Sequence, residues 1–459
     1  MLPTIESSTF VSEGKAIAKA ALVAKNKVDA RQRVVPFPSL PLQNHSHNRK
    51  TKAKPTVSSQ TPLHIPLQAN VLTAPKVLLY SHDTFGLGNI RRTLLLTTAL
   101  REEFPDAAIL IVTGSPVIHA FRIPAGVDYI KLPCLDRVDA EEYQPRFLNH
   151  WADEVRKTRQ AMLNNAILGF KPDLMIVDKR PAGVDNELLE SLELLRHSGH
   201  PTKLVLGVRD ILDDANRTRQ SLIKGQSFEL INRFYDEVWI YGDPVIFDHA
   251  KEYEFPDSVA QKTHYCGYLQ RPTAIAAKSD DRPRVLVTTG GGADGADVVE
   301  TYLEGLLDLP RRTHLHSVVI FGPEMPEERR KALLASYGHL SDVEFCDFEA
   351  DMTRRYAEAD VVVSMAGYNT VCELLSFGQR AILLPRCKPV MEQLIRAQRF
   401  AKLGFFEYID PEQMTPQVLM SAVMNAVGKG TFTMPTIDLG GLGRIRTRVR
   451  TLLTEVVNE

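Results

Sequence analysis

The chain has 459 residues, of which 44% are hydrophobic and 24% charged, and its formal net charge is −1. This composition is that of a globular protein, and the length is too great for one ordinary core, so we expect two domains. No apolar run approaches the roughly 20 residues that a membrane-spanning helix needs. The five cysteines are scattered and form no Cys-x-x-Cys pair, which argues against a disulfide framework or a zinc site and favours the reducing cytoplasm.

The first 74 residues differ from the rest of the chain. Residues 1–75 carry ten basic and three acidic residues, a net charge of +7, so the remainder is acidic. The stretch "GKAIAKAALVAKNKV" favours a short basic helix, and the Pro- and Ser-containing sequence after it is typical of disorder. A basic tail on an acidic body does not indicate nucleic-acid binding. We expect organelle targeting by the basic helix, peripheral contact of the tail with an anionic membrane surface, or a plain solvated tail.

Between residues 75 and 270, short apolar runs alternate with helical patterns. Strands are predicted at 76–80, 107–113, 127–132, 173–178, 203–208 and 237–242. Helices are predicted between several of them, such as 91–104 and 185–199. Continuous Val, Ile and Leu runs favour parallel strands that are covered on both faces. This part of the chain is therefore predicted to form a Rossmann-like domain.

A polar stretch, "TAIAAKSDDRPR", follows and is typical of an inter-domain linker. The pattern restarts in a second Rossmann-like domain at 284–435, and 436–459 is expected to form a C-terminal helix that could pack back on the first domain. Further strands are predicted within 284–292, 316–322, 343–348, 361–367 and 380–385. The predicted fold is α/β, with two doubly wound parallel-sheet domains that face a cleft. Ligands of such sheets bind beyond the carboxyl ends of the strands, so the loops there should carry the function.

The loop "TTGGGADGA" follows the first strand of the second domain and precedes a helix. Gly290, Gly291 and Gly292 let the backbone approach an anion closely, and a helix N-terminus offers N–H groups to it. We predict phosphate binding here, with a flexible turn as the alternative. The loop is neither a GxxxxGK[ST] nor a GxGxxG motif, which disfavours a Mg-nucleotide hydrolase and a nicotinamide enzyme.

The segment "VVVSMAGYNTVCELL" also joins a strand to a helix. The strand is expected to end at Ser364, and Gly367 turns the chain. Asn369 or Thr370 is expected to cap the helix, on which Glu373 follows. A carboxylate at this place can accept hydrogen bonds from a ribose diol, or simply interact favourably with the helix dipole.

A third segment, "LPRCKPVMEQLIRAQRF", places Arg386 and Lys388 near the expected pyrophosphate. Glu392 and Gln393 open the next helix, where they can hydrogen-bond sugar hydroxyls. A solvated helix start is the alternative, because Glu and Gln are common in first turns.

These segments resemble family 28 of the GT-B glycosyltransferases. "TTGGGADGA", "SMAGYNTVCELLSFGQRAILLP" and "MEQLIRAQRFAKLG" are similar to the C-terminal domain of the lipid I GlcNAc-transferase. "HDTFGLG", "LGVRDILDD", "EVWIYGDP" and "YCGYL" resemble a bacterial group of predicted glycosyltransferases. The resemblance implies an enzyme of glycan biosynthesis that transfers a sugar from a nucleotide sugar, in particular a UDP-sugar.

The resemblance also implies roles for single residues on the donor side. Gly291 and Gly292 would meet the diphosphate, and Glu373 the ribose. Glu392 and Gln393 would contact the donor sugar or the adjoining phosphate. The family implies inversion without a metal or a cofactor, since helix dipoles and cations stabilise the leaving nucleotide diphosphate. "DILDDANR", which carries Asp210, Asp213 and Asp214, is accordingly expected to line the cleft or cap a helix rather than bind a metal.

The acceptor, a glycan, a lipid-linked sugar or a small molecule, would enter beside "SHDTFGLGNIRR" in the first domain. Gly86 and Gly88 would make room for it. Arg91 and Arg92 begin the helix and could contact an anionic acceptor, although one of them is expected to be simply solvated. Where the family has a histidine, this chain has Asn89.

Asn89 complicates the assignment of the catalytic base. Inverting transfer needs a group that takes the acceptor hydroxyl proton, and an amide cannot accept a proton at neutral pH. His82 and Asp83 are the candidate replacements. A buried structural histidine and a turn-forming aspartate are their respective alternatives.

Two other functions stay open at this point. A non-hydrolysing UDP-GlcNAc 2-epimerase would share the fold and the donor pocket. A non-catalytic nucleotide-sugar-binding protein is suggested by Asn89. The glycine-rich loop and the Glu392–Gln393 pair favour the transferase.

Overall fold

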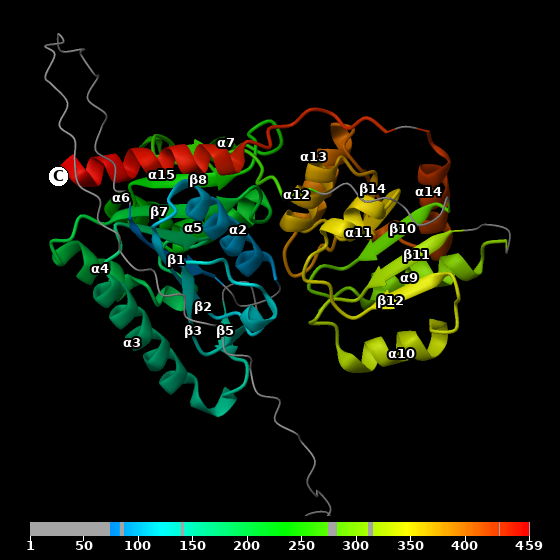
Figure 1. Ribbon diagram of the computed structural model, residues 1–459, viewed down its shortest axis with the longest axis horizontal. Coiled ribbons are helices and arrows are strands. Elements are labelled where there is room, and N and C mark those ends of the chain that lie inside the picture. The colour runs from blue at the N-terminus through cyan, green and yellow to red at the C-terminus, as the bar shows by residue number, and fades with distance from the viewer. Residues whose placement is uncertain are drawn as a thin grey trace, which may run out of the picture. The chain divides into compact units, whose positions relative to one another are not determined.

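The computed structural model describes residues 74–82, 87–138, 142–273, 282–310, 315–430 and 432–458. Within these residues, two parallel sheets, each with helices on both faces, confirm the predicted α/β architecture of two doubly wound units (Figure 1). Except for its last residue, Ala74, the predicted tail lies outside the described residues. Within the described part, no helix is both long and apolar enough to cross a membrane.

The first sheet has the strand order β3-β2-β1-β6-β7-β8-β9, and every neighbouring pair is parallel. Its strands are β1 (Lys76–Ser81), β2 (Ala108–Thr113), β3 (Val127–Lys131), β6 (Leu174–Asp178), β7 (Lys203–Arg209), β8 (Glu237–Tyr241) and β9 (Thr263–Tyr265). A hairpin that the sequence did not predict, β4 (Leu135–Arg137) and β5 (Tyr143–Pro145), lies outside this sheet. The order reverses between β1 and β6, which is where ligands bind in such sheets.

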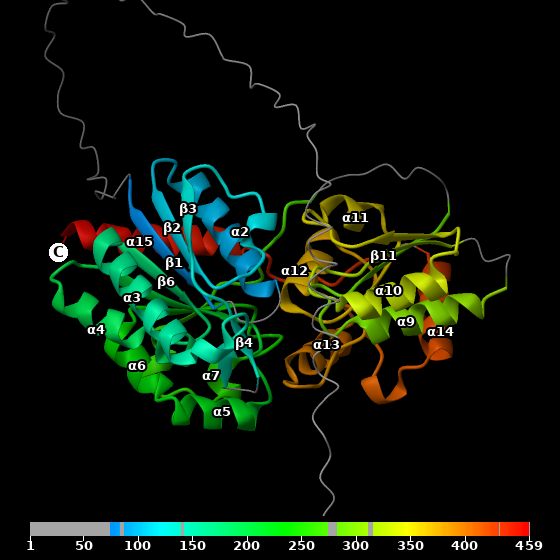
Figure 2. The ribbon, with the colours of Figure 1, turned by 90° about the horizontal axis from the view of Figure 1, so that it is seen from below.

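Both faces of this sheet are covered, which explains why its strands are continuously apolar. Successive side chains of a strand point to opposite faces. Val77 and Leu79 pack with helices α2 and α15, whereas Leu78 and Tyr80 pack with α3, α4 and α6 (Figure 2). These helices span Gly88–Glu103 (α2), Ala152–Phe170 (α3), Leu189–His197 (α4), Ser227–Phe234 (α6) and Gly441–Asn458 (α15).

The second sheet has the order β12-β11-β10-β13-β14-β15 and is also parallel throughout. Its strands are β10 (Arg284–Thr288), β11 (His316–Ile320), β12 (Val343–Cys346), β13 (Val361–Ser364), β14 (Ala381–Leu383) and β15 (Glu407–Tyr408). One face packs on α9 (Ala296–Leu307), α10 (Glu327–Tyr337) and α14 (Pro416–Gly428). The other packs on α11 (Thr353–Glu358), α12 (Tyr368–Phe377) and α13 (Glu392–Lys402). Here the switch point lies between β10 and β13.

The remaining helices are short. They are α5 (Ala215–Lys224), α7 (His249–Glu252), α8 (Asp257–Ala260) and the 3-10 turns η2 (Ile118–Ala120), η3 (Asn149–Trp151), η4 (Val184–Asn186) and η5 (Pro411–Gln413). Of these, α5 follows β7 directly and therefore helps to form the ligand-binding edge of the first sheet.

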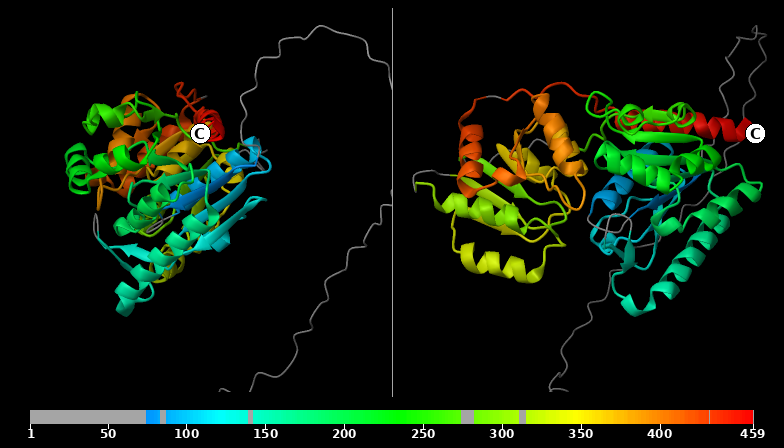
Figure 3. Two further views of the ribbon diagram at one scale, coloured as in Figure 1. Left: turned by 90° about the vertical axis from the view of Figure 1, so that its left-hand side faces the viewer. Right: turned by 180° about the vertical axis from the view of Figure 1, so that it is seen from behind.

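The last helix returns to the first domain. After α14 the chain crosses back, and α15 lies against α2 and β7 (Figures 1 and 3). Ile445, Val449 and Leu453 are fully buried there. Arg448 donates to both carboxylate oxygens of Glu237 on β8, at 2.5 and 2.6 Å.

A buried junction joins the two domains. Arg396 on α13 donates to both carboxylate oxygens of Asp210, which follows β7, at 2.7 and 2.9 Å, and both side chains are almost completely buried. Tyr268, just after β9, donates to the same carboxylate at 3.0 Å. Its ring stacks on Tyr368 of α12 and meets Phe400 of α13 edge-on. The apolar core therefore runs from one domain into the other.

We expect Asp210→Ala to lower the free energy of unfolding by about 3–5 kcal/mol, because it leaves the Arg396 guanidinium buried without its counter-charge. Urea denaturation monitored by circular dichroism would measure the change. Glu193→Ala is the matched control, since it removes the partner of the exposed Arg233 and should cost at most about 1 kcal/mol. Equal losses in the two variants would contradict the role of the buried pair.

Candidate functional site

The carboxyl ends of strands from both sheets surround one cleft. Most of the predicted site residues line it, namely Gly88, Asn89, Arg91, Gly290, Gly291, Gly292, Gly367, Asn369, Thr370, Arg386, Glu392 and Gln393. Ser364, Glu373 and His82 are not among its lining residues. Asp83 and Gly86 lie outside the described residues.

The glycine-rich loop is held in a shape that only glycine adopts easily. Gly290 and Gly292 have φ angles of +68° and +91°. A Cβ at Gly292 would lie 2.2 Å from the carbonyl oxygen of Phe321, whereas a Cβ at Gly290 would meet nothing within 4 Å. Gly290 therefore leaves open space on the cleft side, and α9 begins six residues later with its N–H groups at this edge of the sheet.

The charged residues at the cleft are paired with one another. Glu392 forms ion pairs with Arg209 of β7 and, more distantly, with Arg386 at 3.6 Å and Arg396 at 3.7 Å. Burial alone would raise the pKa of Glu392, but the three guanidinium groups lower it from its usual value, so the carboxylate is ionised at neutral pH. Arg386, the predicted phosphate contact, donates to Asp294 of the glycine-rich loop at 2.7 Å.

Several buried polar atoms have no hydrogen-bond partner among the described residues. They include Oε1 of Gln393, which lines the cleft, and Oγ of Ser364 at the end of β13. Leaving a buried acceptor unpaired costs about 1–3 kcal/mol, so such atoms in a cleft point to a bound ligand or water. Gln393 is therefore a good contact for a ligand hydroxyl.

Glu373 lies deeper than expected. Its carboxylate pairs with Arg91 of α2, and the two line a small adjoining cavity with Tyr356. The expectation that Asn369 or Thr370 caps α12 is wrong. The N-cap residue is Gly367, and no side chain makes a capping hydrogen bond at this helix.

Asn369 instead bridges the domains. Its Nδ2 donates to the carbonyl oxygen of Gly88 at 2.7 Å, and its Oδ1 accepts from Arg271 at 2.6 Å. The Asn369 side chain makes these hydrogen bonds instead of capping α12 because the N-terminus of α12 faces α2.

His82 is fully buried at the end of β1. Its Nε2 lies 3.4 Å from the hydroxyl oxygen of Tyr143. Asn89 donates to the carbonyl oxygen of His82 and accepts from Arg92 at 3.0 Å. Arg92 in turn pairs with Asp178. Asn89 thus ties the start of α2 to the end of β1.

Four charged residues that line the cleft were not predicted from the sequence. Lys179 follows β6, Arg209 ends β7, Asp294 belongs to the glycine-rich loop and Glu324 follows β11. All four follow or end strands at the carboxyl edge. The rule that ligands bind at this edge could have identified them.

The three aspartates of "DILDDANR" have different structural roles. Asp214 caps α5, accepting from the N–H groups of Asn216 and Arg217. Asp213 accepts from the N–H of Met391 at 2.7 Å, and Asp210 pairs with Arg396. Among the described residues, no three His, Cys, Asp or Glu side chains gather as metal ligands would.

Comparison with known proteins relates the second domain to one family. Residues 285–437 match the glycosyltransferase family 28 C-terminal domain. The UDP-N-acetylglucosamine--N-acetylmuramyl-(pentapeptide) pyrophosphoryl-undecaprenol N-acetylglucosamine transferase of Porphyromonas gingivalis (strain ATCC 33277) is 26% identical over 65% of this chain and 73% of its own length. The chain spans only about half the length of other curated relatives, such as the same transferase of Haemophilus influenzae (strain PittGG), of which it covers 46% at 27% identity.

Two solved structures share the fold of the whole body. The glycotransferase of kitacinnamycin has a TM-score of 0.52 at 15% identity and covers 83% of this chain and 96% of its own. The Staphylococcus aureus MnaA–UDP co-structure has a TM-score of 0.56 at 13% identity and covers 84% and 98%. At these identities the likeness establishes the GT-B fold alone.

We expect Gly292→Ala to disturb the cleft more than Gly290→Ala. Both changes place a side chain at positive φ, which costs about 1–2 kcal/mol, but only Gly292→Ala also forces a Cβ against the Phe321 carbonyl. Differential scanning calorimetry should show the larger decrease in Tm for Gly292→Ala. Equal decreases would mean that the loop moves away from Phe321 without cost.

Proposed function

We propose that this family 28-like protein of the GT-B fold is a glycosyltransferase that moves a sugar from a UDP-sugar to an acceptor hydroxyl, with inversion and without a metal. The cleft supports this most directly. It brings the glycine-rich loop, the start of α13 and the end of β7 together, and it contains the unpaired oxygen of Gln393. The match of residues 285–437 to the family 28 domain supports the same function.

In this proposal the donor diphosphate lies against Gly290–Gly292. The open space beside Gly290 admits the phosphate, and the N–H groups of the loop and of the start of α9 stabilise it. Arg386 and Lys179 line the same cleft and add positive charge. These fixed charges stabilise the nucleotide diphosphate as it leaves, which is the main demand of the reaction.

The sugar and the ribose occupy the other end of the donor site. Gln393 accepts from a sugar hydroxyl through its unpaired Oε1. Glu373 accepts from the ribose once Arg91 has moved from it. Because Asn89 cannot take a proton, we assign that step to His82 or to Asp83, the next residue in the sequence.

Gln393→Ala should weaken binding of UDP-N-acetylglucosamine or another UDP-sugar about 3- to 10-fold, the value of one neutral hydrogen bond, and leave UDP binding unchanged. Isothermal titration calorimetry would measure both affinities. Gln413→Ala, at an exposed position on η5, is the control. Equal weakening of UDP and UDP-sugar in Gln393→Ala would contradict a sugar contact.

The activity itself can be tested with the full chain, UDP-sugars and candidate acceptors. Acceptor-dependent release of UDP that continues in EDTA is the expected result. Rapid C2 epimerisation of UDP-N-acetylglucosamine without an acceptor would instead identify an epimerase. UDP-sugar binding without turnover with any acceptor would support a binding protein.

A further inference from the structure

Arg91 lies between the cleft and the small adjoining cavity that holds Glu373. It belongs to the first turn of α2 and lines both spaces, as does Gly290 of the glycine-rich loop. The cavity has a volume of about 20 Å³, and a space of this size admits roughly one water molecule. A ribose is several times larger, so it can reach the Glu373 carboxylate only when the Arg91 guanidinium gives up its place there.

The Glu373 carboxylate has a second positive charge close by. Arg271 donates to Oδ1 of Asn369 at 2.6 Å and to the backbone carbonyl oxygen of Arg91 at 3.4 Å. Burial lowers the pKa of Arg271, the Glu373 charge opposes this, and the Arg91 charge adds to it. Two guanidinium groups thus share one carboxylate, and Glu373 keeps a counter-charge nearby when Arg91 moves away.

Tyr356 is a further partner for Glu373 in this cavity. Burial first, and then the neighbouring carboxylate, raise the pKa of the Tyr356 hydroxyl well above its usual value, so the hydroxyl stays protonated. A protonated hydroxyl can donate a hydrogen bond to the carboxylate. Glu373 is therefore stabilised by Tyr356 and Arg271 as well as by Arg91.

The place to which Arg91 can turn lies at the glycine-rich loop. The Arg91 side chain is 19% exposed, and a Cβ at Gly290 would meet nothing within 4 Å, so the space beside Gly290 is open. Because Arg91 lines both spaces, rotation about its side-chain bonds can carry the guanidinium from the cavity to the cleft without a movement of α2. A guanidinium binds a phosphate with two parallel hydrogen bonds.

The other arginines that line the cleft pair with carboxylates to which the proposed function assigns no ligand. These pairs are Arg92–Asp178, Arg209–Glu392 and Arg386–Asp294. Among the cleft arginines of the described part of the chain, donor binding therefore removes a partner from Arg91 alone.

We propose that Arg91 changes partner when the donor binds: the ribose hydroxyls take its place at Glu373, and its guanidinium turns to the diphosphate. This inference rests on the proposed function, since both groups belong to the donor of that reaction. As the bond between the sugar C1 and the diphosphate oxygen breaks, its electron pair stays on that oxygen, and Arg91 stabilises the negative charge. The acceptor oxygen forms the new bond to C1, and its proton passes to the assigned base. Arg91 thereby acts on the leaving group and not on an anionic acceptor.

This change of partner makes the two halves of UDP interdependent. Uridine displaces Arg91 from Glu373 but offers it no anion, whereas UDP supplies one. The variant Arg91→Gln should therefore bind UDP about 10-fold or more weakly than the unchanged chain, the value of hydrogen bonds to a charged group. It should bind uridine about 3-fold or more tightly, because no ion pair has to be broken first. Isothermal titration calorimetry would measure the UDP affinity, and saturation-transfer NMR the uridine affinity.

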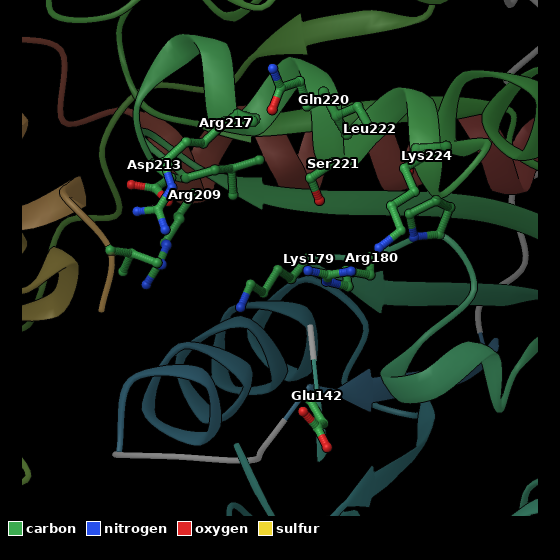
Figure 4. Close-up of a pocket in the computed structure, with 15 residues that line it drawn as sticks. Glu142, Lys179, Arg180, Arg209, Asp213, Arg217, Gln220, Ser221, Leu222 and Lys224 are labelled. Carbon is green, nitrogen blue, oxygen red and sulfur yellow. The ribbon is translucent and has the colours of Figure 1, made fainter. Parts of the chain in front are cut away.

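Lys224→Gln is the control for the loss of a positive charge near the site. Lys224 ends α5 and lines a second cavity, here called the α5 cavity, which shares Arg209 with the cleft (Figure 4). Because Lys224 is exposed, we expect both affinities to change less than about 2-fold in this variant. A fall in both affinities in Arg91→Gln would indicate general damage to the cleft and overturn the proposal, as would unchanged UDP binding.

A second comparison needs no nucleoside. Glu373→Gln keeps the shape of the side chain but releases Arg91 from its ion pair. Inorganic pyrophosphate should therefore bind about 3-fold or more tightly to Glu373→Gln than to the unchanged chain, and Glu373→Gln/Arg91→Gln should lose this gain. The proposal is overturned if Glu373→Gln shows no gain, or if the gain persists in the double variant. If the unchanged chain binds neither UDP nor any UDP-sugar, the proposed function fails instead, whatever these variants do with pyrophosphate.

Discussion

The buried ion pair between Asp210 and Arg396 is the constraint on which the geometry of the cleft depends. Arg396 lies one helical turn after Glu392 on α13, and Asp210 directly follows Arg209 at the end of β7. When the first pair forms, the second is brought into register, so Arg209 meets Glu392 at the cleft. Separating the domains would expose the apolar Tyr268–Tyr368 contact and leave buried charges without partners.

Helix α13 and the end of β7 both hold the two domains together and line the cleft. On α13, Arg396 faces the junction and Gln393 lines the cleft. At the end of β7, Asp210 holds the domains together and Arg209 lines both the cleft and the α5 cavity. A ligand that shifts α13 must therefore act against the junction.

The parallel sheets could be predicted from the sequence because strands buried on both faces are continuously apolar, as in β1 and β10. The glycine-rich loop was also predictable, since its glycines are consecutive and lie between a predicted strand and a predicted helix. Short strands such as β9 and β15 have too few residues to show a hydrophobic pattern, and the hairpin of β4 and β5, with three residues in each strand, was missed for the same reason. The paired state of the charges was not predictable.

That paired state depends on contacts between distant parts of the chain. Glu373 is 282 positions from Arg91 in the sequence, and no local pattern encodes their contact. Asn369 was predicted to cap a helix because capping is a local rule, but its partners are distant in the sequence: Gly88 in the first domain and Arg271 directly after it. Lys179 and Lys224 are 45 positions apart in the sequence, and only the fold brings them to one cavity.

The pairing of Glu373 with Arg91 and of Glu392 with Arg209 has one more consequence. Each of these carboxylates has a guanidinium partner from the opposite domain, Glu392 in the cleft and Glu373 in the small adjoining cavity. A ligand therefore enters by exchange: it must offer the carboxylate hydroxyl donors, or the guanidinium anionic oxygens, that compensate for the partner it displaces. A molecule that offers only hydroxyl donors or only anionic oxygens would leave one of the two charged groups without a partner. The cleft would thereby discriminate between ligands through the free-energy cost of incomplete replacement, as the proposed function requires.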